Sequence, residues 1–324
     1  MPHGDIYPLE LEPVLKDIIW GGERLKNEFG FSTQLEKIAE AWVLTCRPEG
    51  ENKIINGSLA GMSLGEYLAR NSSDALGSAS EKYGEFPLLI KLIDAKKDLS
   101  VQVHPDDDYA RRVENSFGKT EAWYILDCDE GARLIYGFKD KISKEQFRRA
   151  IENNTLMDCV NTVSVKKGDV FFIDAGTLHA IGGGILLAEV QQNCNTTYRV
   201  YDYNRLENGK PRELHVDKAV DVTVTEPPRG DGKPEGEPTD IGGCELTQLA
   251  SCEFFSMELI KVKTGVSIEP DGTTFVSLLV LSGEGMLRCG DTQIELKKGT
   301  SVFVPAKCPR IKIEGKTEIL RSML

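Results

Sequence analysis

Short runs of hydrophobic residues, separated by glycines, prolines and polar residues, recur along most of the chain. Runs of about four to eight residues that are rich in β-branched and aromatic side chains are typical of β-strands. Such runs lie at residues 86–93, 99–104, 121–126, 132–138, 169–173, 185–192 and 197–203. Strands this closely spaced favour a β-barrel or sandwich over a fold of alternating strands and helices.

Three stretches between these runs are predicted to be helices, because each begins with a start signal. Ser63 with Glu66, and Ser143 with Gln146, form capping boxes that satisfy free backbone N–H groups at a helix start. The third stretch follows Pro105 as DDDYARRVEN, and its aspartates suit the positive end of a helix. Because these helices are few, we expect a mainly β fold.

The segment 225–240 interrupts the pattern, because it holds four prolines and three glycines in 16 residues. This composition is unsuited to a regular helix or strand, so we expect a linker or a long irregular crossing. Beyond it, the alternation of strands and turns resumes. The predicted organisation is a first domain over residues 1–240 and an all-β second domain over residues 241–324.

The composition is that of a globular protein, with 40% hydrophobic and 28% charged residues in 324. A net charge of −12 argues against nucleic acid or an anionic membrane as the main partner. This net charge still allows an anionic small molecule to bind where a few cationic side chains converge.

No apolar run is long enough for a membrane span, and no signal peptide is indicated. Eight scattered cysteines without a C-x-x-C motif suggest reduced thiols and a cytoplasmic location. Nothing in the sequence indicates the oligomeric state.

Four polar residues on or beside the predicted strands have the chemistry of metal ligands. Gln102 and His104 are two residues apart, so they point to the same face of a strand. Glu121 and His179 follow in GKTEAWYIL and AGTLHAI. Two imidazoles, a carboxylate and an amide oxygen can coordinate a divalent cation, most naturally zinc, if the fold unites them. A competing interpretation is an amphipathic strand that leaves Ser100, Gln102 and His104 in solvent.

The orientation of Glu121 bears on the choice between these interpretations. Glu121 shares a strand face with Trp123 and Ile125, so a core-facing tryptophan carries the carboxylate inside with it. An unpaired carboxylate there costs several kcal/mol, and a bound cation removes that cost. The opposite orientation, with Ala122 and Tyr124 inward, leaves Glu121 in solvent.

Charged residues also occur on two further predicted strands. Glu189 and Gln191 make one face of ILLAEVQQ polar at its end, and Arg199 lies in TYRVYDY. These residues either pair across neighbouring strands or form the wall of a site for a hydroxylated substrate. His3 and His215 have no candidate partners in the sequence and are expected to have no ligand role.

A weak internal repeat links the two predicted domains. His179 lies eleven residues after Gly168, and Arg310 lies eleven residues after Gly299. Both segments resemble the second conserved motif of cupins, in which a glycine, a β-run and a turn precede a metal-binding histidine. We therefore expect two cupin-type (jelly-roll) β-barrels. The second has arginine in place of that histidine, so only the first is expected to bind metal.

The ordered motifs resemble those of type I mannose-6-phosphate isomerases, in the short bacterial form without the extra helical domain. The resemblance covers almost the whole chain. It runs through IIWGGERL, AEAWVLT, FPLLIKLIDAKKDLSVQVHPDD, GKTEAWYIL, AGTLHAI and LLAEVQQNCNTTYRVYDYNR. Each motif alone is weak, whereas the series in this order is highly specific.

This resemblance implies a zinc-dependent enzyme that interconverts mannose 6-phosphate and fructose 6-phosphate through an enediol. It implies one Zn²⁺ per chain, with the ligands Gln102, His104, Glu121 and His179. It places in the substrate site Ser100, Lys119, Glu189 and Arg199, with Arg205 at the phosphate. Lys119 or Arg199 can stabilise the enediolate. The base stays open between Glu189, a metal-bound water and a neighbouring lysine.

Two other functions fit the same residues. One is another metal-cupin enzyme, such as a dioxygenase or a cupin-type glucose-6-phosphate isomerase. A redox enzyme more typically has a histidine-rich iron site. The other is a sugar-binding cupin without catalysis, against which the complete ligand series argues.

Overall fold

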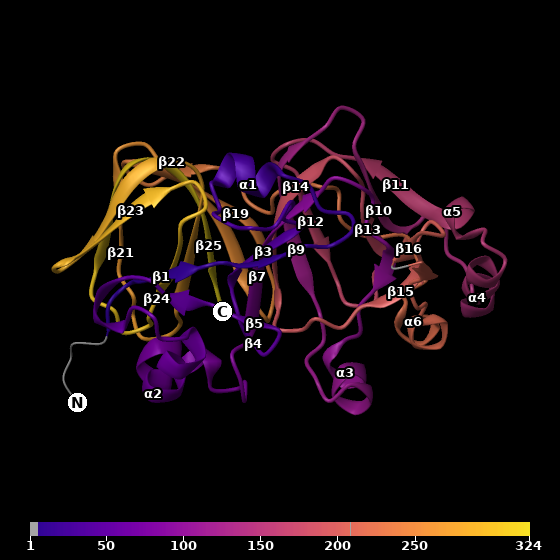
Figure 1. Ribbon diagram of the computed structural model, residues 1–324, viewed down its shortest axis with the longest axis horizontal. Coiled ribbons are helices and arrows are strands. Elements are labelled where there is room, and N and C mark those ends of the chain that lie inside the picture. Colours follow the sequence, from indigo (N-terminus) through magenta and orange to yellow (C-terminus); the bar gives the residue numbers. More distant parts are fainter. Residues whose placement is uncertain (1–5, 208) are drawn as a thin grey trace.

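In the computed structural model, which describes residues 6–207 and 209–324, antiparallel strands form three large sheets (Figure 1). The mainly β fold predicted from the sequence is confirmed. The strand pairing leaves each of these sheets open, so hydrogen bonds alone do not close either half of the molecule into a barrel. His3 lies outside the described residues.

The largest sheet combines strands from the two ends of the chain. Its order is β18 (Thr239–Asp240), β19 (Cys244–Ser251), β20 (Ser256–Val262), β25 (Ile311–Met323), β22 (Val276–Cys289), β24 (Ser301–Val304), β1 (Leu9–Glu12) and β6 (Lys53–Ile54). Two more strands pair within it, β21 (Gly265–Ile268) with β25 and β23 (Thr292–Lys297) with β22. Leu9 pairs with Phe303, so the N-terminal segment extends the sheet of the C-terminal segment.

The other two large sheets come from the middle of the chain and from the N-terminal segment. The six-stranded sheet has the order β12 (Val170–Ile173), β9 (Glu121–Cys128), β14 (Ile185–Gln192), β7 (Leu88–Ala95), β3 (Glu40–Leu44) and β2 (Val14–Lys16). The five-stranded sheet has the order β11 (Val160–Ser164), β10 (Arg133–Phe138), β13 (His179–Ile181), β8 (Val101–Val103) and β15 (Tyr198–Tyr201). Two small hairpins are β4 (Cys46–Arg47) with β5 (Gly50–Glu51), and β16 (Leu206–Glu207) with β17 (Lys210–Pro211).

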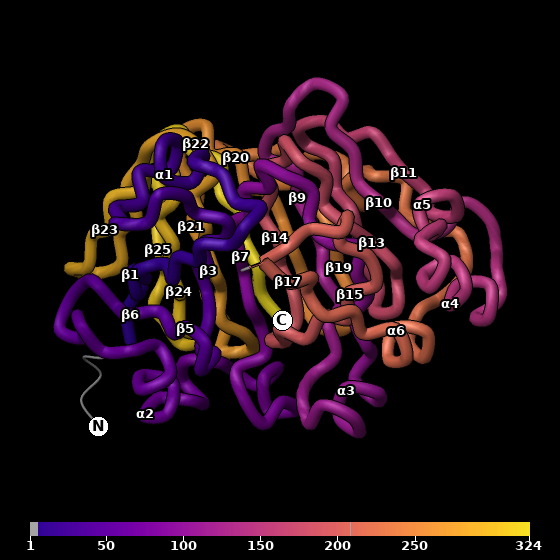
Figure 2. The backbone as a smooth tube through the Cα atoms, turned by 45° about the vertical axis from the view of Figure 1, so that its right-hand side comes forward, coloured from indigo at the N-terminus to yellow at the C-terminus, as the bar shows by residue number. Residues whose placement is uncertain are grey.

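The six-stranded sheet is the middle layer of the molecule, and every residue of its strands β7 and β14 is buried. Ile90 and Val190 belong to the core shared with the ten-stranded sheet. Ile93 and Leu187 belong to the core shared with the five-stranded sheet. Figure 2 shows β22, β23 and β25 on one side of β9 and β14, and β10, β11 and β13 on the other. Burial on both faces explains the nearly continuous hydrophobic runs in the sequence.

The three predicted helices are present. They are α2 (Leu64–Leu76) and α4 (Lys144–Glu152), both with the expected capping boxes, and α3 (Asp107–Val113) with Asp106 as its N-cap. The sequence did not predict α1 (Arg24–Phe29), α5 (Leu156–Cys159), α6 (Val216–Val222) or the 3₁₀ turns Gly57–Leu59 and Ser78–Ser80. In α1, α5 and α6, the side chain of the N-cap residue makes no hydrogen bond to the backbone N–H groups of the first turn. These short helices therefore lack the signal that marks a helix start.

The segment 225–240 is the irregular crossing that its composition predicts, with no helix or strand before β18. It is attached to both neighbouring sheets by backbone hydrogen bonds. Val170 N–H donates to the carbonyl of Gly232 at 3.0 Å, and Gly236 N–H donates to that of Gln248 at 2.9 Å. All eight cysteines are unpaired.

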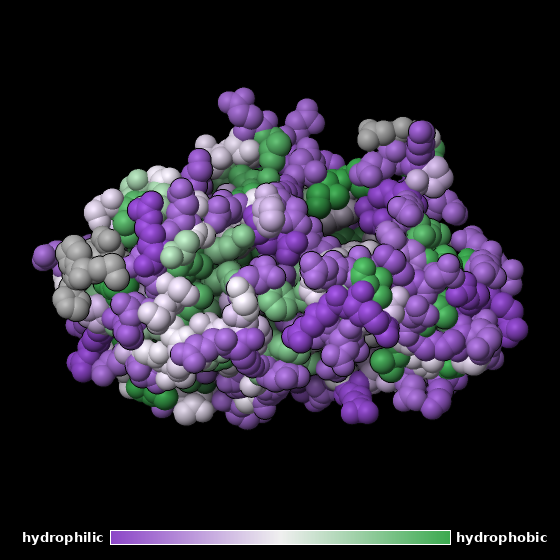
Figure 3. Space-filling model, turned by 90° about the horizontal axis from the view of Figure 1, so that it is seen from below, coloured by the Kyte–Doolittle hydropathy of each residue, from purple (hydrophilic) through white to green (hydrophobic). Residues whose placement is uncertain are grey.

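Hydrophilic side chains cover most of the face drawn in Figure 3, and the hydrophobic ones stand in small groups between them. The large hydrophobic side chains that are exposed come from separate parts of the chain, among them Ile55, Val113 and Ile241. Isolated exposed apolar residues are ordinary on protein surfaces. In the part of the chain that the structure describes, no helix combines the length and apolarity that crossing a membrane requires.

We expect the Phe303→Ala variant to lose about 3–5 kcal/mol of unfolding free energy, because the substitution leaves a cavity between the sheets. Phe303 is fully buried on β24 and stacks on Phe275 with ring centroids 5.2 Å apart. Urea unfolding followed by circular dichroism measures the loss. The control is Ile55→Ala, at a side chain that is 49% exposed, and it should cost less than about 0.5 kcal/mol. Equal losses in the two variants would contradict this account of the core.

Candidate active site

A row of polar side chains crosses the six-stranded sheet on the face that looks toward the five-stranded sheet. Lys91 on β7 lies opposite Glu189 on β14, and Glu189 lies opposite Trp123 on β9. The Lys91 Nζ atom is 3.1 Å from Glu189 Oε1, and Trp123 Nε1 donates to Glu189 Oε2 at 2.9 Å. Burial favours a raised pKa for Glu189, but the charges of Lys119 and Lys91 and the hydrogen bonds outweigh it and lower the pKa. Glu189 is therefore ionised.

A second polar row crosses the five-stranded sheet and faces the first. Gln102 on β8 lies opposite His179 on β13 and, on its other side, opposite Arg199 on β15. Arg199 Nε donates to the hydroxyl of Ser100 at 3.3 Å, and the same oxygen lies 3.4 Å from Gln102 Oε1. Chain segments far apart in the sequence thus meet through strand register.

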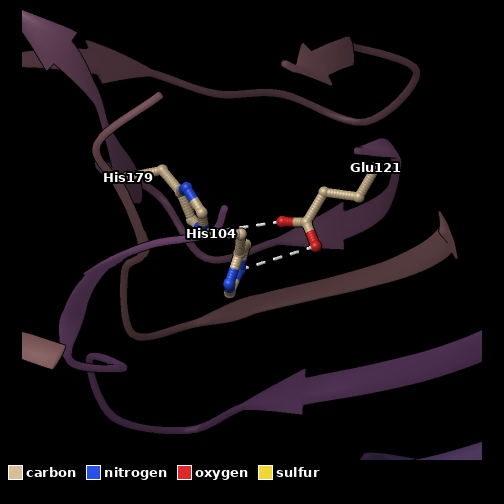
Figure 4. Close-up of side chains that lie close together, drawn as sticks. All are labelled: His104, Glu121 and His179. Atoms are coloured by element: carbon tan, nitrogen blue, oxygen red, sulfur yellow. Dashed lines mark ion pairs between the residues drawn. The ribbon is translucent and has the colours of Figure 1, made fainter. Parts of the chain in front are cut away.

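His104, Glu121 and His179 form a buried group at the end of these rows, and Figure 4 shows both imidazoles turned toward the carboxylate. Their potential ligand atoms all lie within 4.8 Å of one another. His179 Nε2 is 3.4 Å from Glu121 Oε1, and His104 Nε2 is 3.8 Å from Oε2. Together they offer two nitrogens and a carboxylate around one point.

The backbone orients both imidazoles for this arrangement. His104 Nδ1 donates to the carbonyl of Thr196 at 2.8 Å, and His179 Nδ1 donates to that of Thr177 at 2.9 Å. Each Nε2 therefore presents its lone pair to the group. Burial, followed by the charge of Lys119, lowers the pKa of His104 well below its usual value, and burial lowers that of His179 to about 4. Both rings are neutral at pH 7, as metal ligation requires.

Glu121 is fully buried, and among the described residues neither of its carboxylate oxygens accepts a hydrogen bond of good geometry. Burial and the charge of Glu189 raise its pKa, against the opposing effect of Lys119. Lys119 Nζ lies 2.6 Å from Glu121 Oε2 and 3.1 Å from His104 Nε2. The ammonium group of Lys119 is held between these two atoms, which shows that the group of His104, Glu121 and His179 favours a positive charge.

These residues fit a divalent cation of the zinc type. Two neutral imidazoles and a carboxylate are common zinc ligands, and buried oxygens without donors gain most from a cation. Gln102 Nε2 is 3.5 Å from His179 Nε2, and rotating the amide by 180° turns its oxygen toward the group. The structure thus unites Gln102, His104, Glu121 and His179.

A cavity of about 410 Å³ opens above this group, between the two polar rows. Its lining includes five of the predicted residues, namely Ser100, Gln102, Lys119, Glu189 and Arg199. Arg205 is not part of the lining; it binds Asp202 instead. The interpretation of residues 99–104 as a strand with a solvent-facing side is wrong, because Ser100 and His104 are buried and Gln102 is half-buried.

The lining also includes residues to which the sequence analysis gave no role in the site, namely Trp20, Glu40, Lys91, Asn195, Thr197 and Arg212. One signal was available for Lys91, a single charge inside the apolar run FPLLIKLI, which the buried strand retains. Glu40 accepts a hydrogen bond from Trp42 Nε1 at 2.6 Å and lies 3.9 Å from Lys91. No local pattern marks Arg212, which follows β17 on an exposed hairpin.

Comparison with known families gives two matches. The family described as "Phosphomannose isomerase type I, catalytic domain" matches residues 9–132, and "Mannose-6-phosphate isomerase, cupin domain" matches residues 245–324. Over 318 residues the chain is 39% identical to the probable mannose-6-phosphate isomerase GmuF of Bacillus subtilis, covering 98% of this chain and 99% of the relative.

Solved structures agree with these sequence matches. The mannose 6-phosphate isomerase from Bacillus subtilis superimposes with a TM-score of 0.90 at 36% identity, covering 98% of this chain and 100% of the other. A zinc-bound mannose 6-phosphate isomerase superimposes with a TM-score of 0.79, covering 97% of this chain and 98% of the other. At 17% identity, the second comparison shows a shared fold alone.

We expect the Lys91→Met variant to lose about 3–5 kcal/mol of unfolding free energy at pH 7, because it leaves the Glu189 carboxylate buried beside an apolar side chain. Chemical unfolding of the purified protein measures the loss. The matched control is Lys91→Met combined with Glu189→Gln, which removes the charge and keeps an acceptor for Trp123. It should recover most of the stability, and a double variant no more stable than the single one would contradict the ion pair.

Proposed function

We propose that this chain, which belongs to the type I mannose-6-phosphate isomerase family, interconverts mannose 6-phosphate and fructose 6-phosphate. The observation that carries the proposal is the buried group of His104, Glu121 and His179 beneath a cavity lined by cationic side chains. The similarity to mannose-6-phosphate isomerases along nearly the whole chain supports the same substrate. The reaction moves a proton between C1 and C2 of the sugar through an enediol.

Gln102, His104, Glu121 and His179 would hold one zinc ion. When bound, the metal supplies Lewis-acid stabilisation of the negative charge that develops on the substrate oxygens. His104 Nε2 has a single lone pair, so with a metal on this nitrogen the ammonium of Lys119 would no longer be bound there. Lys119 lines the cavity and is then available to the substrate.

Lys119 and Arg199 fit the role of electrostatic stabilisers. Both line the cavity, and a guanidinium stays protonated at neutral pH. Burial favours a lowered pKa for Lys119, but the charges of Glu121 and Glu189 outweigh it and raise the pKa, so the ammonium also stays charged. Fixed positive charges beside the reacting atoms stabilise an enediolate more than they stabilise the neutral sugar.

Glu189 is the base that we favour. It is an ionised carboxylate that lines the cavity, and Trp123 and Lys91 hold it in one orientation. These contacts lower its pKa and make it a weaker base than a free carboxylate.

For the architecture, we propose that the facing six- and five-stranded sheets form the first cupin-type barrel and that residues 241–324 build the second. The catalytic unit then spans residues 1–240, although β1 and β6 pair with the second unit's sheet. The exposed Arg310 pairs with Glu269 at the repeat position where the first unit has His179. One metal site per chain follows.

The unpaired cysteines support a cytoplasmic enzyme.

The decisive experiment is a coupled assay of mannose 6-phosphate isomerisation, run before and after chelation and again after zinc is restored. Turnover should vanish with the metal and return with it, at about one zinc per chain. Binding of the sugar phosphate without turnover in the zinc-loaded protein would instead favour a non-catalytic sugar-binding cupin. A second stoichiometric zinc would contradict the metal-free second unit.

We expect His104→Ala, Glu121→Ala and His179→Ala each to lower kcat by at least about 10³-fold, because each removes a ligand of a catalytic metal. Metal analysis should show reduced zinc in each purified variant. The control is Arg310→Ala, which should change neither zinc content nor rate. A ligand variant that keeps both zinc and the wild-type rate would refute the assignment.

We expect Glu189→Gln to lower kcat by about 10²–10⁴-fold, the usual contribution of a positioned base. Glutamine keeps the shape and the acceptor for Trp123, so zinc content and the KM for mannose 6-phosphate should change little. Steady-state kinetics with metal analysis measures all three quantities. A variant with near-normal kcat would assign proton transfer to another group.

A further inference from the structure

Residues 118–120 lead into β9 without belonging to a helix or strand, and all three are buried. This short segment carries Lys119, which lines the cavity, and it ends directly before Glu121 of the metal-ligand group. Buried backbone N–H groups outside regular structure need partners of another kind. Whatever binds these N–H groups therefore also sets the positions of Lys119 and Glu121.

Two side chains accept the N–H groups on either side of Lys119. Gly118 N–H donates to Asp107 Oδ1 at 2.7 Å. Thr120 N–H donates to Gln192 Oε1 at 2.9 Å, and Gln192 N–H donates back to the carbonyl of Thr120 at 3.2 Å. Lys119 is thus flanked by an acceptor from the start of α3 and by one from the end of β14.

The two acceptors are also bound to each other. Gln192 Nε2 donates to Asp107 Oδ1 at 3.0 Å, and this is the oxygen that accepts from Gly118. The same bond fixes the orientation of the amide, because its oxygen then faces Thr120. Gln192 is buried, and hydrogen bonds to a carboxylate are stronger than those between neutral groups. We call Asp107 and Gln192 the loop clamp.

The loop clamp connects the chain segments that carry the metal-ligand group. Lys119 N–H donates to the carbonyl of Pro105, the residue after His104, at 2.9 Å. Asp107 lies two residues further along the same segment. The segment of His104 is therefore bound to the segment of Lys119 and Glu121, and Gln192 attaches both to β14. Neither clamp residue belongs to the lining of the cavity or to the metal-ligand group.

We propose that Asp107 and Gln192 are positioning residues, which set the places of Lys119 and Glu121 relative to His104 through the backbone of residues 118–120. This inference rests on the proposed isomerase function and adds two residues that act through others. Misplacing a reacting group by about 1 Å can lower a rate by about 10²-fold. Loss of a group that orients metal ligands typically lowers metal affinity or activity by about 10- to 100-fold.

The test measures kcat and KM for mannose 6-phosphate in the zinc-loaded enzyme, and the zinc dissociation constant by competition with a chromogenic chelator. Asp107→Ala removes the acceptor that Gly118 and Gln192 share, and Gln192→Met removes the acceptor of Thr120. Each variant should lower kcat and raise the zinc dissociation constant by about 10-fold. KM should change less than about threefold, because neither residue lines the cavity.

Asp107→Asn is the conservative variant that should rescue both properties. Its amide oxygen can accept from Gly118 and Gln192, so kcat and zinc affinity should stay within about threefold of wild type. The matched control is Asp108→Ala, because Asp108 is an exposed aspartate in the same first turn of α3. This control removes the same favourable charge from the helix start and should also leave kcat and zinc affinity within about threefold of wild type.

A purely structural role of the loop clamp gives a different result. Asp107→Ala and Gln192→Met would then melt at a lower temperature but keep the kcat and zinc affinity of wild type, which would overturn the inference. Asp107→Asn or Asp108→Ala variants as impaired as Asp107→Ala would overturn it too. If Gln192→Met does not fold, Gln192→Glu decides by the same criteria. It sets a carboxylate oxygen in place of the amide nitrogen that lies 3.0 Å from Asp107 Oδ1.

Zinc binding separates this inference from the proposed function. A wild-type protein that binds zinc but never turns over mannose 6-phosphate would overturn the isomerase activity, and the zinc affinities of the variants would still decide the role of the loop clamp. Turnover by the wild type, with unchanged kcat and zinc affinity in both clamp variants, would overturn the loop clamp alone.

Discussion

The register of three buried antiparallel strands is the constraint on which the rest of the molecule depends. Strands β7 and β14, and β9 up to Leu126, have hydrophobic cores on both sides, so each of their side chains must lie toward one core or the other. In the observed register Lys91 and Glu189 lie opposite each other and share a face with the cavity. A slip of one residue would send this pair into the core beside the ten-stranded sheet and turn Ile90 and Val190 to the cavity. Such a slip would bury an ion pair in an apolar layer, which is energetically unfavourable. The observed register, and with it the position of the site, is therefore fixed.

Electrostatic compensation follows from that burial. Lys91 lies against Glu189, and Lys119 lies against Glu121, so each buried carboxylate has a cation beside it. These contacts do not add much to stability by themselves, since desolvation opposes them, but removing one partner leaves an unpaired charge. Arg199 differs from Lys91 and Lys119, because it has no carboxylate partner in the described part of the chain. The cavity thus has a neutralised interior and a positive rim, an arrangement suited to an anionic, hydroxylated ligand.

The order of the chain explains why the site combines so many separate segments. Residues on β3, β7, β8, β13, β14 and β15, together with loop residues and a hairpin that follows these strands, contribute side chains to a single cavity. Lys91, Gln102 and Glu189 sit on strands whose backbone hydrogen bonds leave little freedom, which places these side chains with the accuracy that catalysis requires. Arg212 instead follows a short exposed hairpin, and hydrogen bonds to Asp202 fix its orientation.

Local physics in the sequence determined seven strands in the middle of the chain, the three capped helices, the irregular crossing and the mainly β class, whereas strands such as β1, β11 and β13 lie outside the runs that it marked. Alternation within a strand also placed Glu121 on the face of Trp123, which the structure confirms in the buried layer. The sequence alone could not choose between that face and the opposite one, since both are apolar in a strand buried on two sides. Lys91 and Arg212 were missed for a related reason. A strand pattern shows which residues alternate between the two faces of a strand. The neighbours of a side chain across the cavity depend instead on sheet packing and on contacts between residues far apart in the chain. Only the tertiary structure decides this packing and these contacts.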